Sequence, residues 1–480
     1  MAETKGKKIT ISPVTRIEGH ARITLQYDAT GKLDEARFHV NEFRGFEKFC
    51  EGRYFTEMPA ITPRICGICP VSHAVCSAKA GESIMRIQPP RIGDQLRRLI
   101  QLGQMISSHA LSFYHLSSPD MLMGWDCDPD KRNIVGMYEQ FPDLVRRGIR
   151  LRQFGQEISM YITGKKIHTM GVVCGGMSIP LKEEAREALL KWIPEALETL
   201  DMSLELYKGY YEKNKEELNA FAYHPTMYMG LVQADGTHEF YDGKVRLVDE
   251  KGEIVEDGFN PEDFARYIAE HPIAWSYLKY PYYKPYGFEK GFYRVGPLAR
   301  LNVAERMSTP LAQKEFELFR RLEDGKVIHG TFHFHYARLI EMLSSVEQAR
   351  DILNDPQILS TETWARGERN QHDGVGCTEA PRGILFHHYT TDDNGLLTKV
   401  NLLIATGQNN PAMNTSIKQV AEKYVKLDDV QEGALNRVEG AIRCYDPCLS
   451  CSTHAAGQMP LLIELKDHHG KVVRTLARGG

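Results

Sequence analysis

The segment ITPRICGICPVSH, residues 61–73, contains two cysteines separated by two residues, and the same spacing recurs in CYDPCLSCSTH, residues 444–454. Four thiolates suit a soft or borderline metal ion, because thiolate sulfur prefers zinc, iron, copper(I) or nickel to magnesium or calcium. The two pairs could meet at one metal site, or each could close a local turn of its own. They are Cys66 and Cys69, and Cys448 and Cys451.

The bulk properties of the chain exclude several classes of protein. Its 480 residues are 42% hydrophobic, enough to bury a large core, and the net charge of -4 offers no basic field for nucleic acid or an anionic membrane. The start MAETKGKKITIS lacks the apolar region of a secretion signal, and no apolar run reaches the roughly 18 residues that a membrane span needs. Ten cysteines are too few for a disulfide-stapled scaffold of this size, so we expect a cytoplasmic protein with metal-binding or catalytic thiols.

Short β segments are predicted at the N-terminus and at two later hairpins. The segments YDGKVRLVDEKGEIVEDG (241–258) and ILFHHYTTDDNGLLTKVNLLI (384–404) each place a glycine-containing turn between alternating runs. Both are expected to form exposed hairpins. Alternation of apolar and polar residues predicts N-terminal strands within residues 8–14, 21–28 and 35–43.

Most of the remaining chain has the periodicity of helices. Apolar residues recur every three or four positions from Arg91 to about Leu116 and again around residues 151–162, which predicts long core helices. A third helical region is expected from Lys182 to about Ala222, ended or kinked at Pro194, with more helix after residue 311. The predicted fold is mainly α: a multi-helical core of long packed helices with small peripheral antiparallel sheet and hairpin elements.

No internal repeat, low-complexity tract or long linker divides the chain. We therefore expect one compact unit, with a β-rich N-terminal lobe at residues 1–60 and a helical core with hairpins at residues 61–454. A structural zinc site is the plainest interpretation of the cysteine pairs, but zinc usually stabilises a unit too small to hold its own core. Polar residues beside both pairs instead suggest a working site: Arg64, His73, Asp446 and His454.

Five ordered blocks together resemble the large subunit of nickel-iron hydrogenases. They are PVTRIEGH (13–20), RGFE (44–47), RICGICPVSH (64–73), EAPRG (379–383) and DPCLSCSTH (446–454). The match spans nearly the whole chain, and the details look closest to the cytoplasmic, bidirectional, NAD-reducing branch, including the tail AAGQMPLLIELKD that begins at residue 455.

The resemblance implies a centre in which all four cysteines bind nickel while Cys69 and Cys451 also bridge to an iron. The resemblance also implies that the iron would carry carbon monoxide and cyanide, ligands that the protein does not encode. Splitting hydrogen into a proton and a hydride requires an open metal position and a base close beside it, and electron-rich thiolates serve both needs. Pairs on distant segments allow the core to clamp the metals between two lobes and exclude water.

Two carboxylates and one imidazole of this sequence match residues with known roles in the family. Glu18 matches the carboxylate that takes the proton from a nickel-bound thiolate, a role that burial would favour by raising its pKa. The alternative for Glu18 is a surface glutamate on a strand. Glu47 and His454 match ligands of a magnesium ion, a hard cation that usually keeps several waters; a plain salt bridge is the alternative for Glu47.

Above the open metal position, the resemblance places Arg382, with Pro381 beside it and Asp446 as its partner. Arginine does not lose its charge, so Arg382 is assigned electrostatic and positioning work, with a buried ion pair as the alternative. The resemblance places Ser108 beside Arg382 and Asp446 over the metals, and these three residues are called the canopy below. Many relatives carry an aspartate in place of Ser108. This departure puts in doubt a carboxylate-assisted step above the metals and leaves Glu18 as the expected proton acceptor.

The other histidines and cysteines in the sequence are assigned no metal. His73, His109 and His115 are equally compatible with orienting neighbouring groups and with packing in the core. The other cysteines do not form the close-set run of an iron-sulfur cluster and are expected to be packing thiols: Cys50, Cys76, Cys127, Cys174, Cys377 and Cys444.

Neither a second redox centre nor a GxGxxG dinucleotide turn is recognisable in the sequence. Electrons from hydrogen therefore require a partner, and the resemblance implies a small subunit with iron-sulfur clusters, followed by a flavin- and NAD-containing diaphorase module. It also implies a maturation protease that cuts after His454 and removes residues 455–480. That tail alternates around His469-Gly470 and is expected to form a hairpin.

Alternative functions remain open at this point. The chain could be the large subunit of a ferredoxin-, disulfide- or deazaflavin-linked hydrogenase, or a metal-free structural relative in a respiratory complex. Retention of all four cysteines and Arg382 counts against loss of the metal.

Overall fold

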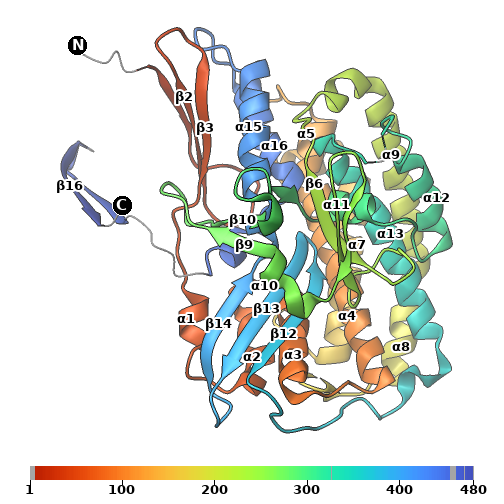
Figure 1. The fold of residues 1–480 in the computed structure, drawn as a ribbon. Coiled ribbons are helices and arrows are strands. Elements are labelled where there is room, and N and C mark those ends of the chain that lie inside the picture. The colour runs from red at the N-terminus through yellow and green to blue at the C-terminus, as the bar shows by residue number, and fades with distance from the viewer. Residues whose placement is uncertain (1–5, 326, 455–460, 470, 479–480) are drawn as a thin grey trace.

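Four long helices form the core of the protein, shown in a computed structural model that describes residues 6–325, 327–454, 461–469 and 471–478 (Figure 1). They are α4 (Arg91–Ala110), α7 (Pro142–Thr163), α9 (Ile193–Asn219) and α13 (Phe334–Asn354). Helix α4 packs against α7 and α13, and α13 also packs against α9. Because α13 is surrounded, it is buried along almost its whole length, and the prediction of long core helices is confirmed.

Helix ends follow the signals in the sequence. Helix α4 begins directly after Pro90, and beyond Ala110 the chain continues as a π-helical segment, Leu111–Ser117. The third predicted helical region is two helices, α8 (Glu183–Leu190) and α9, with Pro194 in the first turn of α9. The predicted break near this proline is confirmed, because proline is tolerated in a first turn and not in a helix interior.

The N-terminal strands form an antiparallel sheet in the order β1-β2-β3, as predicted. The strands are β1 (Lys8–Ile11), β2 (Arg22–Tyr27) and β3 (Leu33–His39). Ile23 and Leu25 are fully buried, and α15 (Asn410–Tyr424) packs against β3. A helix from the C-terminal part of the chain therefore covers the N-terminal sheet.

The hairpin predicted at residues 241–258 is present as β7 (Lys244–Val248) and β8 (Ile254–Phe259). Its predicted exposure is wrong for β7, which is mostly buried. The reason is that β7 pairs with β6 (Met227–Val232), while α11 (Pro297–Val303) packs against both strands. The sheet has the order β11-β6-β7-β8, and β11 (Tyr293–Arg294) runs parallel to β6.

The hairpin predicted at residues 384–404 is also present, as β13 (Gly383–Thr391) and β14 (Leu397–Leu403). Its predicted exposure is wrong for β13, whose residues are mostly buried. Strand β12 (Asp373–Ala380) pairs with the other edge of β13, and α3 (Pro70–Met85) packs against both strands. Helix α3 thereby joins the first cysteine pair to this sheet.

The last helices bring the second cysteine pair to the same region. Helix α16 (Glu432–Tyr445) packs against α15 and is followed by the short helix α17 (Leu449–Ser452). The tail forms the predicted hairpin, β15 (Leu461–Lys466) paired with β16 (Val472–Arg478), whereas residues 455–460 lie outside the described part of the chain. Within the described residues, no helix has the length and apolar character needed to cross a bilayer.

Shorter α-helices and strands connect the elements described above. The helices are α1 (Phe46–Cys50), α2 (Met58–Ile61), α5 (Ser118–Leu122), α6 (Ile134–Gln140), α10 (Phe264–Tyr267), α12 (Pro310–Phe319) and α14 (Ala405–Gln408). The strands are β4 (Val172–Val173), β5 (Gly176–Met177), β9 (Ile268–His271) and β10 (Tyr280–Tyr283).

Candidate metal centre

Each cysteine pair lies where a loop meets the start of a helix. Cys69 immediately precedes α3, and Pro70 occupies the first turn of that helix, a position that proline favours. Cys448 immediately precedes α17, which contains Cys451. The N-terminal end of a helix favours negative charge, so both segments suit thiolates.

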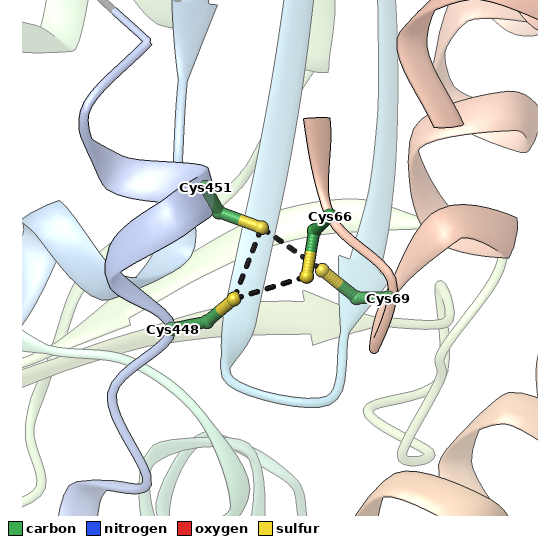
Figure 2. Close-up of side chains that lie close together, drawn as sticks. All are labelled: Cys66, Cys69, Cys448 and Cys451. Carbon is green, nitrogen blue, oxygen red and sulfur yellow. Dashed lines mark hydrogen bonds between the residues drawn. The ribbon is translucent and has the colours of Figure 1, made fainter. Parts of the chain in front are cut away.

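The two pairs meet in one buried cluster of sulfur atoms (Figure 2). The Sγ atoms of Cys66 and Cys448 are 3.1 Å apart, as are those of Cys69 and Cys451. All four sulfurs lie within 4.8 Å of one another, and all four residues are buried. The alternative of two separate local turns is therefore wrong, and the four-sulfur donor set fits a soft or borderline metal.

The protonation of these thiols is set by burial and by their contacts with one another. Hydrogen bonds from Cys448, Cys451 and Cys66 hold the pKa of Cys69 well below its usual value. Burial raises the pKa values of Cys448 and Cys451 well above theirs. Ionisation of all four adjacent buried thiols would need a cation to balance the charge, which is what a bound metal supplies.

A cavity of about 10 Å³, space for roughly one water molecule, adjoins one side of the cluster. The cysteines that line it are Cys69, Cys448 and Cys451, whereas Cys66 does not. Its other walls are mostly apolar and include Pro381 and Leu385. The cavity thus lies beside Cys69 and Cys451, the two residues that the family resemblance assigns to a second metal.

Arg382 reaches the cluster from the turn between β12 and β13. Its guanidinium forms an ion pair with Asp446 at 2.8 Å and donates a hydrogen bond to Ser108 Oγ at 3.2 Å. Burial opposes the charge, but Asp446 and the thiolates raise the pKa of Arg382, so it stays a cation. Asp446 itself has a left-handed backbone, φ 52°, at the end of α16, a sparsely populated conformation that aims its buried carboxylate at Arg382.

Glu18 lies beside the second cysteine pair. Its carboxylate accepts hydrogen bonds from the backbone N–H of Ser450, at 3.0 Å, and from the Ser450 hydroxyl. The backbone carbonyl of Glu18 accepts a hydrogen bond from the N–H of Leu449 at 3.2 Å. Glu18 is only partly buried in this chain, so it stands between the cysteine segment and the surface.

Glu47 and His454 also come together. His454 Nε2 is 3.5 Å from Glu47 Oε1 and has no hydrogen-bond partner within the described residues, although His454 is buried. Burial raises the pKa of Glu47 to about 7 and lowers that of His454 to about 3, so the imidazole is neutral. The Glu47 carboxylate accepts a hydrogen bond from the N–H of Leu402 at 2.7 Å. This carboxylate and the unpartnered neutral imidazole fit two ligands of a divalent cation.

Several contacts of the site are not evident from the sequence. His73 Nδ1 is 3.1 Å from His387 Nε2, and His73 Nε2 is 3.5 Å from Cys451 Sγ, so His73 belongs to the site. His387 was missed, because its position in an alternating strand gives no signal for burial. Ser450 is visible between the second pair of cysteines, but its contact with Glu18 depends on tertiary structure.

His109, His115 and the other six cysteines do not belong to the group of four candidate ligands. His109 is bonded to Glu341 at 2.8 Å, and His115 Nδ1 is buried without a partner among the described residues. All ten cysteines are free, and the four-cysteine cluster is the one group of three or more candidate ligands in the described chain. The outcome agrees with the prediction of packing thiols elsewhere; five of the other six cysteines are buried and Cys127 is half-buried.

Comparisons with known proteins agree with this geometry. Residues 44–127 and 217–454 match the nickel-dependent hydrogenase family, and residues 8–43 match a family described as HoxL-like. The chain is 44% identical over 475 residues to one of the subunits of the F420-non-reducing hydrogenase vhc of Methanococcus voltae, covering 98% of this chain and 100% of the relative. It is 39% identical over 487 residues to the beta subunit of the NAD-reducing hydrogenase HoxS of Cupriavidus necator, again covering 98% and 100%.

A solved structure shares the whole architecture. An NAD+-reducing NiFe hydrogenase in the H2-reduced state matches with a TM-score of 0.92 and 40% identity, covering 94% of this chain and 100% of the other. These likenesses extend over nearly the full chain and include both cysteine pairs. The chain therefore belongs to the nickel-dependent hydrogenase family.

Proposed function

We propose that this hydrogenase subunit binds nickel through all four cysteines and iron through the shared sulfurs of Cys69 and Cys451. The observation that carries the proposal is the meeting of two remote cysteine pairs in one buried cluster. The cavity beside Cys69 and Cys451 supports the placement of the iron. Its apolar lining suits carbon monoxide, and Arg382 and Thr406 in the same lining carry donors that suit cyanide. When bound, the two metals supply the reversible heterolytic cleavage of H2.

Glu18 is proposed to accept the proton that leaves a cysteine sulfur. Its contacts with Ser450 hold the carboxylate against the segment between Cys448 and Cys451, and its partial exposure provides a route outward. A carboxylate at the boundary between a buried centre and solvent suits a proton relay. Ser108 replaces the aspartate that many relatives carry above the metals and cannot accept the proton as a carboxylate would. The carboxylate of Asp446 is also near, but it is paired with Arg382.

Arg382 is proposed to stabilise negative charge at the centre. It is a permanently charged, fully buried guanidinium whose orientation is fixed by Asp446 and Ser108. A preoriented charge in a water-poor site acts without reorganisation during the reaction. Glu47 and His454 are proposed to hold magnesium, which would tie the end of the metal-binding segment to α1.

Electrons are proposed to leave through a small subunit that contains iron-sulfur clusters. The described residues contain no second group of three or more candidate metal ligands to carry them, and the named relatives are themselves subunits. NAD is the proposed final acceptor, reached through a flavin-containing module, with support from the NAD-reducing relative and structure. The F420-non-reducing relative, at 44% identity, makes an acceptor other than NAD or F420 the second candidate.

Maturation and location complete the proposal. Cleavage after His454 by a maturation protease would remove residues 455–480; the intact mass of active protein tests this, and a mass that still includes the tail would refute it. A cytoplasmic location is proposed, with support from the ten free cysteines.

Hydrogen-dependent dye reduction by the copurified subunits tests the function. We expect activity from the complex and none from this chain alone. Reduction by the chain without iron-sulfur protein would refute the role of the partner. Replacing the dye by NAD+ separates the two acceptor candidates, since only the NAD-linked assembly would produce NADH.

A further inference from the structure

We propose that Arg300 is a positioning residue that fixes the turn carrying Arg382 at the metal centre. This inference rests on the proposed role of Arg382. Strands β12 and β13 pair as far as Ala380 and Gly383, which leaves Pro381 and Arg382 alone in the turn. The direction of the Arg382 side chain therefore depends on what holds the backbone of a two-residue turn.

Arg300 holds that backbone directly. From α11, its Nη1 donates a hydrogen bond to the carbonyl of Ala380 at 2.9 Å, and its Nη2 donates one to the carbonyl of Pro381 at 3.2 Å. The two carbonyls immediately precede Arg382 in the chain. A guanidinium presents its donors in a rigid plane, so two bonds to consecutive carbonyls restrict both the position and the tilt of the turn.

Arg300 is itself held by acidic residues. Glu341 on α13 accepts from Nε at 2.6 Å and from Nη2 at 2.7 Å, and Glu379 on β12 accepts from Nη1 at 2.7 Å. All three side chains are fully buried. Together with the two carbonyls, these acceptors engage all five N–H groups of the guanidinium.

Glu341 connects this anchor to the rest of the core. It also contacts His109 Nε2 at 2.8 Å, on α4, and His238 Nε2 at 3.3 Å. Helix α4 carries Ser108 next to His109, and Ser108 accepts a hydrogen bond from Arg382. The same carboxylate, that of Glu341, therefore contacts both the arginine that holds the turn and the helix that carries Ser108.

A purely structural role does not explain this arrangement well. Buried ion pairs contribute little net stability compared with apolar residues of the same size, because desolvation of the charges offsets their attraction. Positioning does explain why two of the five donors are directed at the carbonyls before Arg382. Lysine at position 300 would keep the charge but provides three donors in place of five, so the turn would lose part of its support.

The test is a mutant cycle in the copurified complex, with kcat and KM measured for hydrogen-dependent dye reduction. We expect Arg300→Lys to lower kcat by up to about 100-fold, the loss typical of a displaced catalytic group, while nickel content and KM change little. Arg382→Lys should lower kcat by about 100-fold. The double variant should be no slower than Arg382→Lys within about 3-fold, because both changes act through one group.

Arg97 provides a matched control. It is a fully buried arginine that pairs with Glu82 and donates to the carbonyls of Gly176 and Val173, away from the turn. Arg97→Lys should keep kcat within about 3-fold of the unmodified complex. When it is combined with Arg382→Lys, the two fold-losses in kcat should multiply, as expected of independent sites. A loss in Arg97→Lys as large as that in Arg300→Lys would overturn the positioning role.

Hydrogen-deuterium exchange of residues 376–386 is a second readout that needs no turnover. Arg300→Lys should speed exchange around the turn relative to Arg97→Lys, in protein with or without metal. If Arg300→Lys does not fold, Glu379→Gln provides the same test. Its Oε1 would keep the hydrogen bond from the N–H of Leu231, which turns the amide NH2 toward Arg300 and displaces it.

Unchanged exchange at the turn, or multiplicative losses of kcat in the double variant, would overturn the inference. Failure of Arg382→Lys to lower kcat would refute the proposed role of Arg382 instead. In that case exchange still reports whether Arg300 holds the turn.

Discussion

The sulfur of Cys66 lies 3.1 Å from that of Cys448, although 382 residues separate the two in the sequence. The contact closes the space between the start of α3 and the end of α16, and Cys69 and Cys451 repeat it at the same distance. The four cysteines are buried and their sulfur atoms lie together. A bound metal would balance the negative charge of their thiolate forms.

Removal of one sulfur should abolish metal binding. Cys451→Ala should leave less than about one tenth of the nickel of the unmodified complex and no hydrogen-dependent activity, because the proposed shared ligand of both metals is lost. Cys444→Ala is the matched control, since this buried thiol lies in the same segment outside the cluster. Full nickel content in Cys451→Ala, measured by elemental analysis, would contradict the ligand assignment.

Proton transfer should depend on Glu18. Glu18→Gln keeps the size of the side chain and an acceptor for Ser450 but cannot carry the proton, so kcat should fall by about 100-fold to 10000-fold with nickel retained. Glu42→Gln, at an exposed residue paired with His20, should have no such effect. An activity of Glu18→Gln equal to that of Glu42→Gln would remove Glu18 from the relay.

Substitutions in the canopy should lower kcat by different amounts, less at Ser108 than at Arg382. Ser108→Ala removes one hydrogen bond from a guanidinium that keeps its ion pair with Asp446, so we expect a loss of kcat of about 10-fold or less. This loss should be smaller than that of Arg382→Lys. A larger effect of Ser108→Ala would mean that the serine does more than orient Arg382.

Magnesium binding should weaken as the pH falls. Burial raises the pKa of Glu47 to about 7, so below that pH a proton competes with the cation for the carboxylate. His454, with its pKa lowered to about 3, stays neutral throughout this range and adds no pH dependence. Magnesium content after dialysis should therefore rise from about pH 6 to about pH 8 and then level off.

Glu47→Gln should remove the dependence and weaken binding at every pH. Magnesium content that is constant from about pH 6 to about pH 8 in the unmodified protein would contradict the assignment of Glu47 as a ligand.

Local patterns in the sequence predicted the helices well. The three-to-four periodicity located α4 and α7, and Pro194 marked the break before α9, because these signals depend on neighbouring residues. The joining of the two cysteine pairs was expected from the family resemblance, whereas their spacing alone left two separate local turns open.

Burial of charged and polar groups was less predictable. His387 lies in an alternating strand and was expected in an exposed hairpin, yet it is fully buried against His73. Arg300 and Glu341 lie on two different helices, α11 and α13, and in the sequence both look like ordinary charged surface residues. Their burial and their contact become evident only when α11, α13 and β12 pack together. Interactions of this kind follow from tertiary arrangement, which residue periodicity does not encode.

Elemental analysis combined with infrared spectroscopy of the purified complex tests the central claim most directly. The four-cysteine assignment predicts nickel bound to this chain at about one ion per chain, together with iron and absorption bands of carbon monoxide and cyanide. Zinc in place of nickel, with no such bands, would contradict the account.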